Sequence, residues 1–312
     1  MNKPRRPPRR AVNGVLLLDK PQGLSSNDAL QKARRLFNAA KAGHTGTLDP
    51  MATGLLPLCF GEATKFAGEL LDADKAYAAT VRLGITTDTA DAEGQVLETR
   101  PVTATEGEVL AVLERFRGEI EQVPPMHSAL KRDGKPLYEY ARAGIEVERA
   151  ARRVTIHALE LSNWQGDRFD LDVSCSKGTY IRTLAADIGA ALGCGAHLTA
   201  LRRTRIGGLE LAGAVTLAAL EDMDMPARDV RLFAADALLA ELPRADLDAA
   251  GAGRLLHGQG VRWAGAAGGR WRCYAADGAF LGIAETSPDG WLNPKRLVAA
   301  NAEQTGKTTE PA

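Results

Sequence analysis

The chain has 312 residues and is 45% hydrophobic, so it can bury a full core in one large domain with a small one attached, or in two moderate domains. Its 39 basic residues balance its 39 acidic residues, which points away from a strongly basic nucleic-acid binder. No segment approaches the roughly 18 consecutive apolar residues of a membrane helix, and the N-terminus has no apolar core like that of a signal peptide. We therefore expect a cytoplasmic protein without a membrane partner.

Cysteine spacing and charge distribution narrow the possibilities further. The four cysteines lack the spacing of zinc ligands, so we expect reduced thiols, with neither disulfide nor metal. Residues 1–10 carry five basic groups and no acidic one, and basic residues crowd 131–153 and 202–205, whereas 221–248 is mainly acidic. Such segregation leaves room for a polyanionic partner on one face, although ordinary solvated helices would give the same pattern.

The start of the chain predicts a strand and a helix. GVLLLDKPQG (14–23) is apolar and ends in a Pro and Gly turn, which is typical of a buried strand. Ser25, with Asp28 three residues later, resembles a capping box. The apolar residues that follow fall on one helical face: Leu30, Ala33 and Phe37.

Two further strands and a helix are predicted downstream. Residues 77–84 and 168–176 alternate between apolar and polar side chains, the period of half-buried strands. The segment KGTYIRTLAADIGAALG (177–193) leads into a predicted helix with Leu184, Ile188 and Leu192 on its core face, and Gly193 is placed to end it.

The remaining segments differ in composition. Residues 124–153 are basic and turn-rich, which suggests a projecting insertion. Acidic helices are predicted within 217–242. From 243 onward, short strands separated by Gly-rich turns indicate a small β module.

The loop HTGTLDPMATGLLP (44–57) presents a candidate functional carboxylate. Its glycines let a ligand approach the main chain, and Pro50 disfavours a helical conformation at Asp49, which should project that carboxylate from a fixed loop. The spacing is not that of a phosphate-binding loop, and a metal centre would need ligands besides His44. A glycosidase usually needs two carboxylates. Asp49 is thus either a lone covalent nucleophile or the cap of a turn or helix.

The same loop matches the catalytic signature of the TruB family of tRNA pseudouridine synthases. Three other stretches resemble the family's motifs in the right order: GVLLLDKPQGLSS with Lys20 and Pro21 at its centre, YAATVRLGITTDTADAEG, and SCSKGTYIRTLAADIGAALG followed by LRRTRIGG. These motifs span residues 14–208. Beyond about 245, only the pattern around GRLLHGQGV resembles a PUA-like RNA-binding module. By this resemblance the chain is identified as a member of the family.

The resemblance implies an α/β (α+β) fold with a mixed, largely antiparallel central sheet and a catalytic cleft across its middle, plus a small C-terminal β-rich module. The expected organisation follows: a basic disordered extension (1–12), a catalytic domain (13–242) whose insertion (about 124–153) is similar to the family's thumb loop, a PUA-like module (243–303) and a tail (304–312).

The resemblance also implies a reaction and the residues for it. Asp49 is expected to be the catalytic carboxylate for isomerising the uridine at position 55 in the T loop of tRNA. The glycosidic bond breaks, the base rotates, and C5 rejoins C1′, without cofactor or obligate protein partner. The family also implies roles for other residues. Tyr77 is expected to stack on uracil, Arg182 to pair with Asp49, Tyr180 and Leu201 to line the pocket, and His44 to pack against the T loop. RNA contacts are expected from Lys65, Asp91, His127, Lys131 and Arg132.

Two other functions remain open at this point. An RNA-binding protein or tRNA folding chaperone, with secondary or absent catalysis, would need the same RNA-binding surfaces. A nucleoside hydrolase acting on free nucleosides is disfavoured by the basic insertion, the PUA-like module and the lack of metal ligands.

Overall fold

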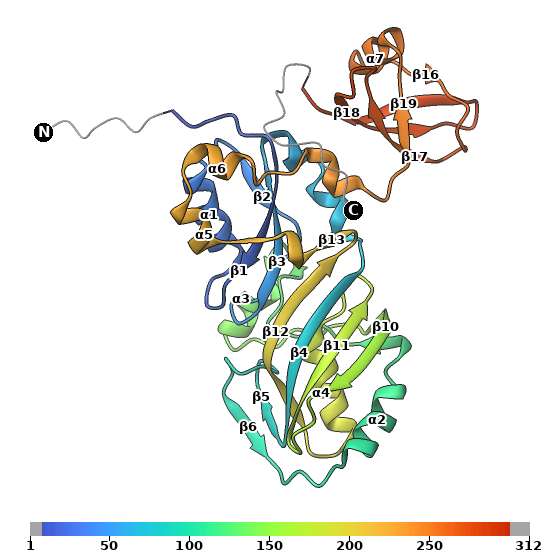
Figure 1. Cartoon of the computed structure of the whole chain (residues 1–312). Coiled ribbons are helices and arrows are strands. Elements are labelled where there is room, and N and C mark those ends of the chain that lie inside the picture. The colour runs from blue at the N-terminus through green and yellow to red at the C-terminus, as the bar shows by residue number, and fades with distance from the viewer. Residues whose placement is uncertain (1–7, 300–312) are drawn as a thin grey trace, which may run out of the picture.

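The structure is a computed structural model that describes residues 8–299 as a large domain and a smaller C-terminal module (Figure 1). The fold begins earlier than expected, because the Arg10 backbone pairs with Ala39 and the Val12 side chain is 2% exposed. The predicted disordered extension is therefore wrong for these residues. Its first seven residues and the predicted tail lie outside the described part of the chain.

A ten-stranded sheet forms the centre of the large domain. Its strands are β1 (Gly14–Lys20), β2 (Ala42–His44), β3 (Thr53–Phe60), β4 (Lys75–Leu83), β7 (Gly118–Gln122), β10 (Arg152–Ser162), β11 (Arg168–Cys175), β12 (Ala196–Ile206), β13 (Leu209–Glu210) and β14 (Val215–Thr216). The main path runs β14-β1-β3-β12-β4-β11-β10-β7. Within this sheet β1 pairs with β14 and β3 with β12 in parallel, and the other pairs are antiparallel. The predicted mixed, largely antiparallel sheet is confirmed.

Alternating side chains explain the middle of this sheet. In β4 and β11, Val81 lies opposite Phe169 in the register, and both side chains are fully buried. Their polar neighbours point to the other face, where the Thr80 hydroxyl donates to Asp170 at 2.7 Å. Burial of one face and solvation of the other is what the two-residue period predicts.

Helices α1 (Ser26–Leu36), α2 (Glu106–Glu114) and α4 (Ile181–Ala191) belong to the large domain. The Ser25 side chain caps α1 by accepting from the Asp28 amide, as its sequence predicts. In α4, Leu184 and Ile188 are fully buried, and Gly193 follows with φ +80°, the left-handed conformation of a helix end. Figure 1 shows α4 and α2 lying together against one side of the long strands.

The acidic segment forms shorter helices than the composition suggests. It contains α5 (Leu217–Asp222), α6 (Met225–Asp229) and the 3₁₀ helix η4 (Ala235–Leu239). Asp224 caps α6 by accepting from the Ala227 amide, and Asp229 pairs with Arg10 at 2.5 Å. Part of the acidic charge is therefore used for capping and for holding the N-terminal segment.

Two excursions interrupt the central sheet. The first is the hairpin β5 (Ile85–Thr87) and β6 (Val96–Thr99), which the sequence did not predict. The second is the insertion predicted at 124–153, which lies between the neighbouring strands β7 and β10, except that its last two residues already belong to β10. It contains β8 (Lys131–Arg132), β9 (Lys135–Pro136) and α3 (Leu137–Arg142). Leu137, 4% exposed, anchors α3, while most charged residues of the insertion are exposed.

The C-terminal module has strands β15 (Arg244–Asp246), β16 (Val261–Arg262), β17 (Arg270–Tyr274), β18 (Phe280–Thr286) and β19 (Trp291–Leu297), in the order β15-β17-β18-β19-β16. The predicted β module is thus present. The sequence analysis missed its helix α7 (Ala249–Leu256), which Asp248 caps by accepting from the Gly251 amide.

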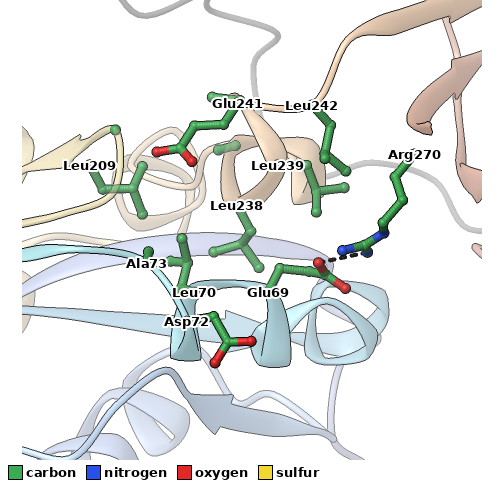
Figure 2. Close-up of a pocket in the computed structure, with 13 residues that line it drawn as sticks. Glu69, Leu70, Asp72, Ala73, Leu209, Leu238, Leu239, Glu241, Leu242 and Arg270 are labelled. Carbon is green, nitrogen blue, oxygen red and sulfur yellow. Dashed lines mark hydrogen bonds and ion pairs between the residues drawn. The ribbon is translucent and has the colours of Figure 1, made fainter. Parts of the chain in front are cut away.

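The module joins the large domain through a shared apolar cluster and polar bonds. Buried Tyr274 packs in one cluster with Val15 and Leu238, and its hydroxyl donates to Asp236 at 2.6 Å. Figure 2 shows a pocket beside this boundary, where Arg270 of the module reaches Glu69 of the 3₁₀ helix η2 (Ala67–Leu71) at 2.7 Å. The pocket contains none of the predicted site residues.

Candidate active site

The loop that carries Asp49 connects two strands at the middle of the sheet. It leaves β2 at His44 and enters β3 at Thr53. The backbone of β3 pairs with β1 on one side and runs parallel to β12 on the other. Both ends of the loop are therefore fixed in the sheet, and the Asp49 side chain, 37% exposed, remains accessible between them.

Asp49 forms an ion pair with Arg182, the second residue of α4. An Arg182 nitrogen (NH2) lies 2.9 Å from Asp49 Oδ2, and the Arg182 side chain is only 4% exposed. Burial raises the pKa of the Asp49 carboxyl, while the Arg182 charge and hydrogen bond oppose that rise. The arginine thus favours the ionised carboxylate in a place where desolvation favours the neutral acid.

Arg182 also connects three other segments to the site. Its guanidinium donates to the main-chain oxygens of Thr89 at 2.9 Å and His127 at 2.7 Å, and lies 3.6 Å from the Asp91 carboxylate. The Asp91 side chain is 4% exposed, so it is a buried partner of Arg182 rather than the accessible RNA contact that was expected. Through His127, the insertion contacts the same arginine that pairs with Asp49.

Lys20 anchors the Asp49 loop to the turn that follows β1. Its side chain is fully buried, and Nζ donates to the main-chain oxygens of Pro21 at 3.0 Å, Leu24 at 2.6 Å and Pro50 at 3.4 Å. Burial lowers the pKa of Lys20 to about 8, and attraction to Asp49 opposes the change. Lys20 therefore ties the turn after β1 to the residue that follows Asp49.

The other predicted pocket residues lie on neighbouring elements. Tyr77 is a half-buried residue of β4, and burial raises the pKa of its phenol. Leu201, 7% exposed, lies on β12. Tyr180 immediately precedes α4, where its amide donates to the Gln122 side chain at 3.0 Å and the Arg152 guanidinium lies 5.1 Å from its ring centroid. The sequence analysis did not identify Gln122 or Arg152.

His44 is half-buried at the entrance of the loop. Burial lowers its pKa, and the nearby Arg203 charge acts in the same direction, so the neutral imidazole is favoured. Its Nδ1 is buried without a hydrogen-bond partner among residues 8–299. A neutral ring of this kind suits packing against a base better than binding a phosphate.

The predicted RNA contacts occupy different surroundings. Lys131 and Arg132 form β8 in the exposed hairpin of the insertion, and Arg132 donates to the Glu148 main-chain oxygen at 2.7 Å. Lys65 lies at the boundary with the C-terminal module instead, bonded to Glu62 at 2.7 Å and to the Leu297 oxygen at 2.9 Å. An RNA contact by Lys65 would require it to exchange these partners.

Arg203 is the site residue that the sequence analysis misread. It was counted with surface basic residues at 202–205, but its side chain is among the largest that are fully buried, at 1% exposure. It bonds to the main chain of the Asp49 loop and lies beside Tyr77. The motif LRRTRIGG was the available signal, because it places Arg203 in a stretch already matched to the family.

Groups that could bind a metal are not clustered in the described part of the chain. No set of three or more His, Cys, Asp or Glu side chains with ligand geometry occurs among residues 8–299. The cysteines are free and buried: Cys59, Cys175, Cys194 and Cys273. The site offers an accessible carboxylate, Asp49, a buried arginine paired with it, and a tyrosine ring nearby.

No helix in the described part of the chain is long and apolar enough to cross a membrane.

Family models match almost the whole described chain. "TruB family pseudouridylate synthase (N terminal domain)" matches residues 34–181, "tRNA pseudouridylate synthase B C-terminal domain" matches 182–240, and "Pseudouridine synthase II TruB, C-terminal" matches 243–298.

Relatives with a curated name cover nearly the same length. The protein named tRNA pseudouridine synthase B from Aromatoleum aromaticum is 62% identical over 299 residues, which cover 95% of this chain and 97% of the relative. Those of the same name from Azoarcus sp. and Burkholderia mallei are both 61% identical, covering 97% and 94% of this chain and 99% of each relative.

Solved structures agree on the fold. A Cbf5-Nop10-Gar1 complex contains a chain with a TM-score of 0.67 and 26% identity, covering 88% of this chain and 78% of that one. An H/ACA ribonucleoprotein bound to a substrate RNA containing 2′-deoxyuridine gives a TM-score of 0.70 at 21% identity, covering 94% of this chain and 87% of that one.

Proposed function

Because the chain belongs to the TruB family of pseudouridine synthases, we propose that it isomerises the uridine at position 55 in the T loop of tRNA, with Asp49 as the catalytic carboxylate. The coarser activity, pseudouridine formation in tRNA, is that of its relatives. The observation that carries the finer proposal is the pair of accessible Asp49 and buried Arg182 at 2.9 Å.

The reaction needs one carboxylate and no added group. The C1′–N1 bond of the uridine breaks, the freed uracil rotates, and a C1′–C5 bond forms, while C5 loses a proton and N1 gains one. Atoms and charge are conserved, so no water, oxidant or donor is consumed. Asp49 acts as the nucleophile or electrostatic base in this isomerisation, held ionised by Arg182. A second accessible carboxylate that activated water would divert the reaction to hydrolysis.

The uracil must stay bound while it turns. Tyr77 supplies an aromatic plate that lets a base slide and rotate in its own plane, and Leu201 and Tyr180 supply the other walls. Flipping the uridine out of the T loop costs a few kcal/mol, which stacking and phosphate contacts offset. His44 fills space against the distorted loop, and Lys131 and Arg132 bind the backbone.

The test is release of tritium from C5-labelled uridine in an unmodified tRNA transcript. Wild-type protein is expected to release the label of one uridine, and mapping places that pseudouridine at position 55. A transcript with cytidine at position 55 is the matched substrate control and should release nothing. No release from either transcript, with tight binding of both, would contradict the proposal and favour a tRNA folding chaperone. Activity on free uridine would favour a nucleoside enzyme.

A further inference from the structure

Arg203 lies where three strands of the central sheet meet. Its backbone pairs with Gly54 of β3 and with Tyr77 of β4, and a register shift follows it in β12. Gly54 has φ +95°, and a Cβ there would lie 2.3 Å from the Arg203 oxygen, so only glycine allows this approach. Bulges of this kind often redirect a side chain beside an active site.

The Arg203 side chain bonds to the first part of the Asp49 loop and to β3 just beyond the loop. Its Nε donates to the Leu55 oxygen at 2.8 Å, and NH2 donates to the Gly46 oxygen at 3.1 Å. Gly46 has φ +73°, and a Cβ there would lie 3.6 Å from the NH1 atom of Arg203. The guanidinium group is therefore bonded to the loop at Gly46 and to β3 at Leu55.

No carboxylate lies within 4 Å of Arg203 among residues 8–299. A buried cation without a counter-ion is expensive unless several dipoles solvate it, and burial lowers the pKa of Arg203 while the Tyr77 phenol opposes the change. If the Arg203 side chain only filled space in the core, an apolar residue would do so at a lower free-energy cost. The fork of donors is what Arg203 adds, since a guanidinium can reach several oxygens in fixed directions.

Tyr77 is the third group that Arg203 faces. The two residues are opposite each other in the register of β12 and β4, and the phenol oxygen lies beside the guanidinium. Because arginine has only donors, the phenol oxygen is the group that would accept in a hydrogen bond between the two, and such a bond would fix the tilt of the ring. One buried side chain thus contacts the loop of the carboxylate and the residue expected to stack on the base.

We propose that Arg203 is a positioning residue, which sets the distance between Asp49 and the Tyr77 ring by bonding the loop at Gly46, β3 at Leu55 and the phenol at the same time. This inference rests on the proposed function of the site. It predicts that Arg203 acts on the rate of isomerisation more than on tRNA binding, because it has no accessible surface with which to contact RNA. Misplacement by about 1 Å can cost a hundredfold in rate.

The test compares Arg203→Lys and Arg203→Met with Arg205→Met. Arg205 lies on the same strand and also makes two neutral bonds, to the Gly207 oxygen and the Ser174 hydroxyl at 3.2 Å each. Single-turnover tritium release at saturating tRNA should fall about tenfold for Lys and about a hundredfold for Met. We expect tRNA affinity to stay within about threefold and Arg205→Met to stay near wild type. Where Arg203→Met does not fold, the Lys variant decides.

A double-mutant cycle with Tyr77→Phe separates positioning from general destabilisation. Removing the phenol removes one partner of Arg203, so Arg203→Lys should cost less in that background than alone. Independent effects that multiply, or a rate within about twofold of wild type for Arg203→Lys and Arg203→Met, would overturn the proposal. Equal losses of rate and tRNA affinity would also overturn it.

A measurement that does not depend on enzymatic activity separates the proposed role of Arg203 from the proposed function of the protein. The chain has five tyrosines, and 3-fluorotyrosine labelling gives a fluorine resonance for each, that of Tyr77 being the one lost in Tyr77→Phe. This resonance should shift in Arg203→Lys and not in Arg205→Met. An unchanged resonance would overturn the role of Arg203. Absence of tritium release from the wild type would instead overturn the proposed function.

Discussion

The junction of β3, β12 and β4 and the insertion at 124–153 both carry arginines, but they hold them differently. At the junction Arg203 is 1% exposed, and beside it, at the start of α4, the Arg182 side chain is 4% exposed; main-chain oxygens accept from both. In the insertion, Lys131 and Arg132 are exposed on a two-residue strand. Under the proposed function, the junction would fix groups for chemistry before the substrate arrives, whereas the insertion would offer exposed groups to an RNA backbone.

This difference predicts which variants should change the rate of the chemical step and which should change tRNA affinity. Charges that are buried and fully bonded cannot move without leaving other groups unpaired, so their loss should act on the chemical step. Exposed charges pair with phosphates by releasing counterions, so their loss should act on affinity and on its dependence on salt. A variant of one region that behaved like the other would break this comparison.

The largest effect is expected for Asp49→Asn. The amide keeps the shape of the side chain but is neither a nucleophile nor a base, so tritium release should fall at least about a thousandfold. The tRNA affinity should stay within severalfold, as measured by filter binding. Asp229→Asn, which breaks a distant pair with Arg10, is the control and should retain full activity. Retained turnover in Asp49→Asn would exclude Asp49 as the catalytic carboxylate.

Arg182→Met should have the next largest effect. It leaves Asp49 and the buried Asp91 without their shared cation and frees the His127 and Thr89 oxygens. Without the guanidinium, the Asp49 carboxylate loses the charge that opposes its raised pKa, so we expect a loss of about a hundredfold to a thousandfold in single-turnover rate. Arg202→Met removes a more exposed pair with Asp19 and should cost about threefold at most. Equal losses would mean that burial of the pair is unimportant.

We expect the dependence of the reaction rate on pH to be set by the groups around Asp49 and not by the insertion. The proposed reaction needs ionised Asp49, whose pKa is raised from 3.8 by burial, so the rate should rise with pH through that higher value. Arg182→Met should move this acid limb to still higher pH, because the arginine opposes the rise. On the alkaline side, Lys20 loses its proton as pH rises through about 8, its lowered pKa, which weakens its bond to Pro50 beside Asp49. Single-turnover rates at saturating tRNA measure both limbs.

The alkaline loss should not be unfolding. The folded protein binds the Lys20 proton less tightly than the unfolded chain does, because the pKa is about 8 against 10.5. Between these values the unfolded chain holds more protons, so this group makes the free energy of unfolding rise with pH. A rate that falls above pH 8 while the urea midpoint does not fall would support this reading. Lys20→Met should lack the limb, and an unaltered limb would assign it to another group.

The smallest effect is expected for the double variant Lys131→Ala and Arg132→Ala. Loss of two phosphate contacts should weaken tRNA binding about tenfold at moderate salt and reduce the slope of log affinity against log salt by about one to two. The single-turnover rate at saturation should not change. Replacing Arg82 and Arg100, exposed residues paired with carboxylates, is the charge-matched control. A double variant with normal affinity and a reduced rate would assign these residues to the junction.

The fold elements with clear periodicity were predictable from the sequence. The strand that begins at Gly14, the helix capped by Ser25 and the alternating strand around Phe169 are all present. The strand β12 was missed, because arginines at 202, 203 and 205 hide its pattern. Helix α2 was also missed, although Thr105 and Glu108 form a capping box that the sequence displays.

The site was predictable as a set of residues but not as a network. Motif resemblance selects Asp49 and Arg182, and the structure brings them to 2.9 Å. Motif resemblance could not reveal that Asp91 is buried beside Arg182, nor that Arg203 is interior, because burial depends on strands that are distant in the chain. Residue type alone assigns an arginine to the surface, and only the packed sheet shows the exception.

The long-range bonds of Arg203 also set an order of events during synthesis. Gly46 and Arg203 are 157 positions apart, so the Asp49 loop leaves the ribosome roughly ten to thirty seconds before the residue that bonds to it. Until then β3 lacks its parallel neighbour β12, and β4 lacks one of its two neighbouring strands. Such distant pairings form late. The nascent chain therefore presents the Asp49 loop before Arg203 can bond to it, and the loop reaches its final geometry only when β12 joins the sheet.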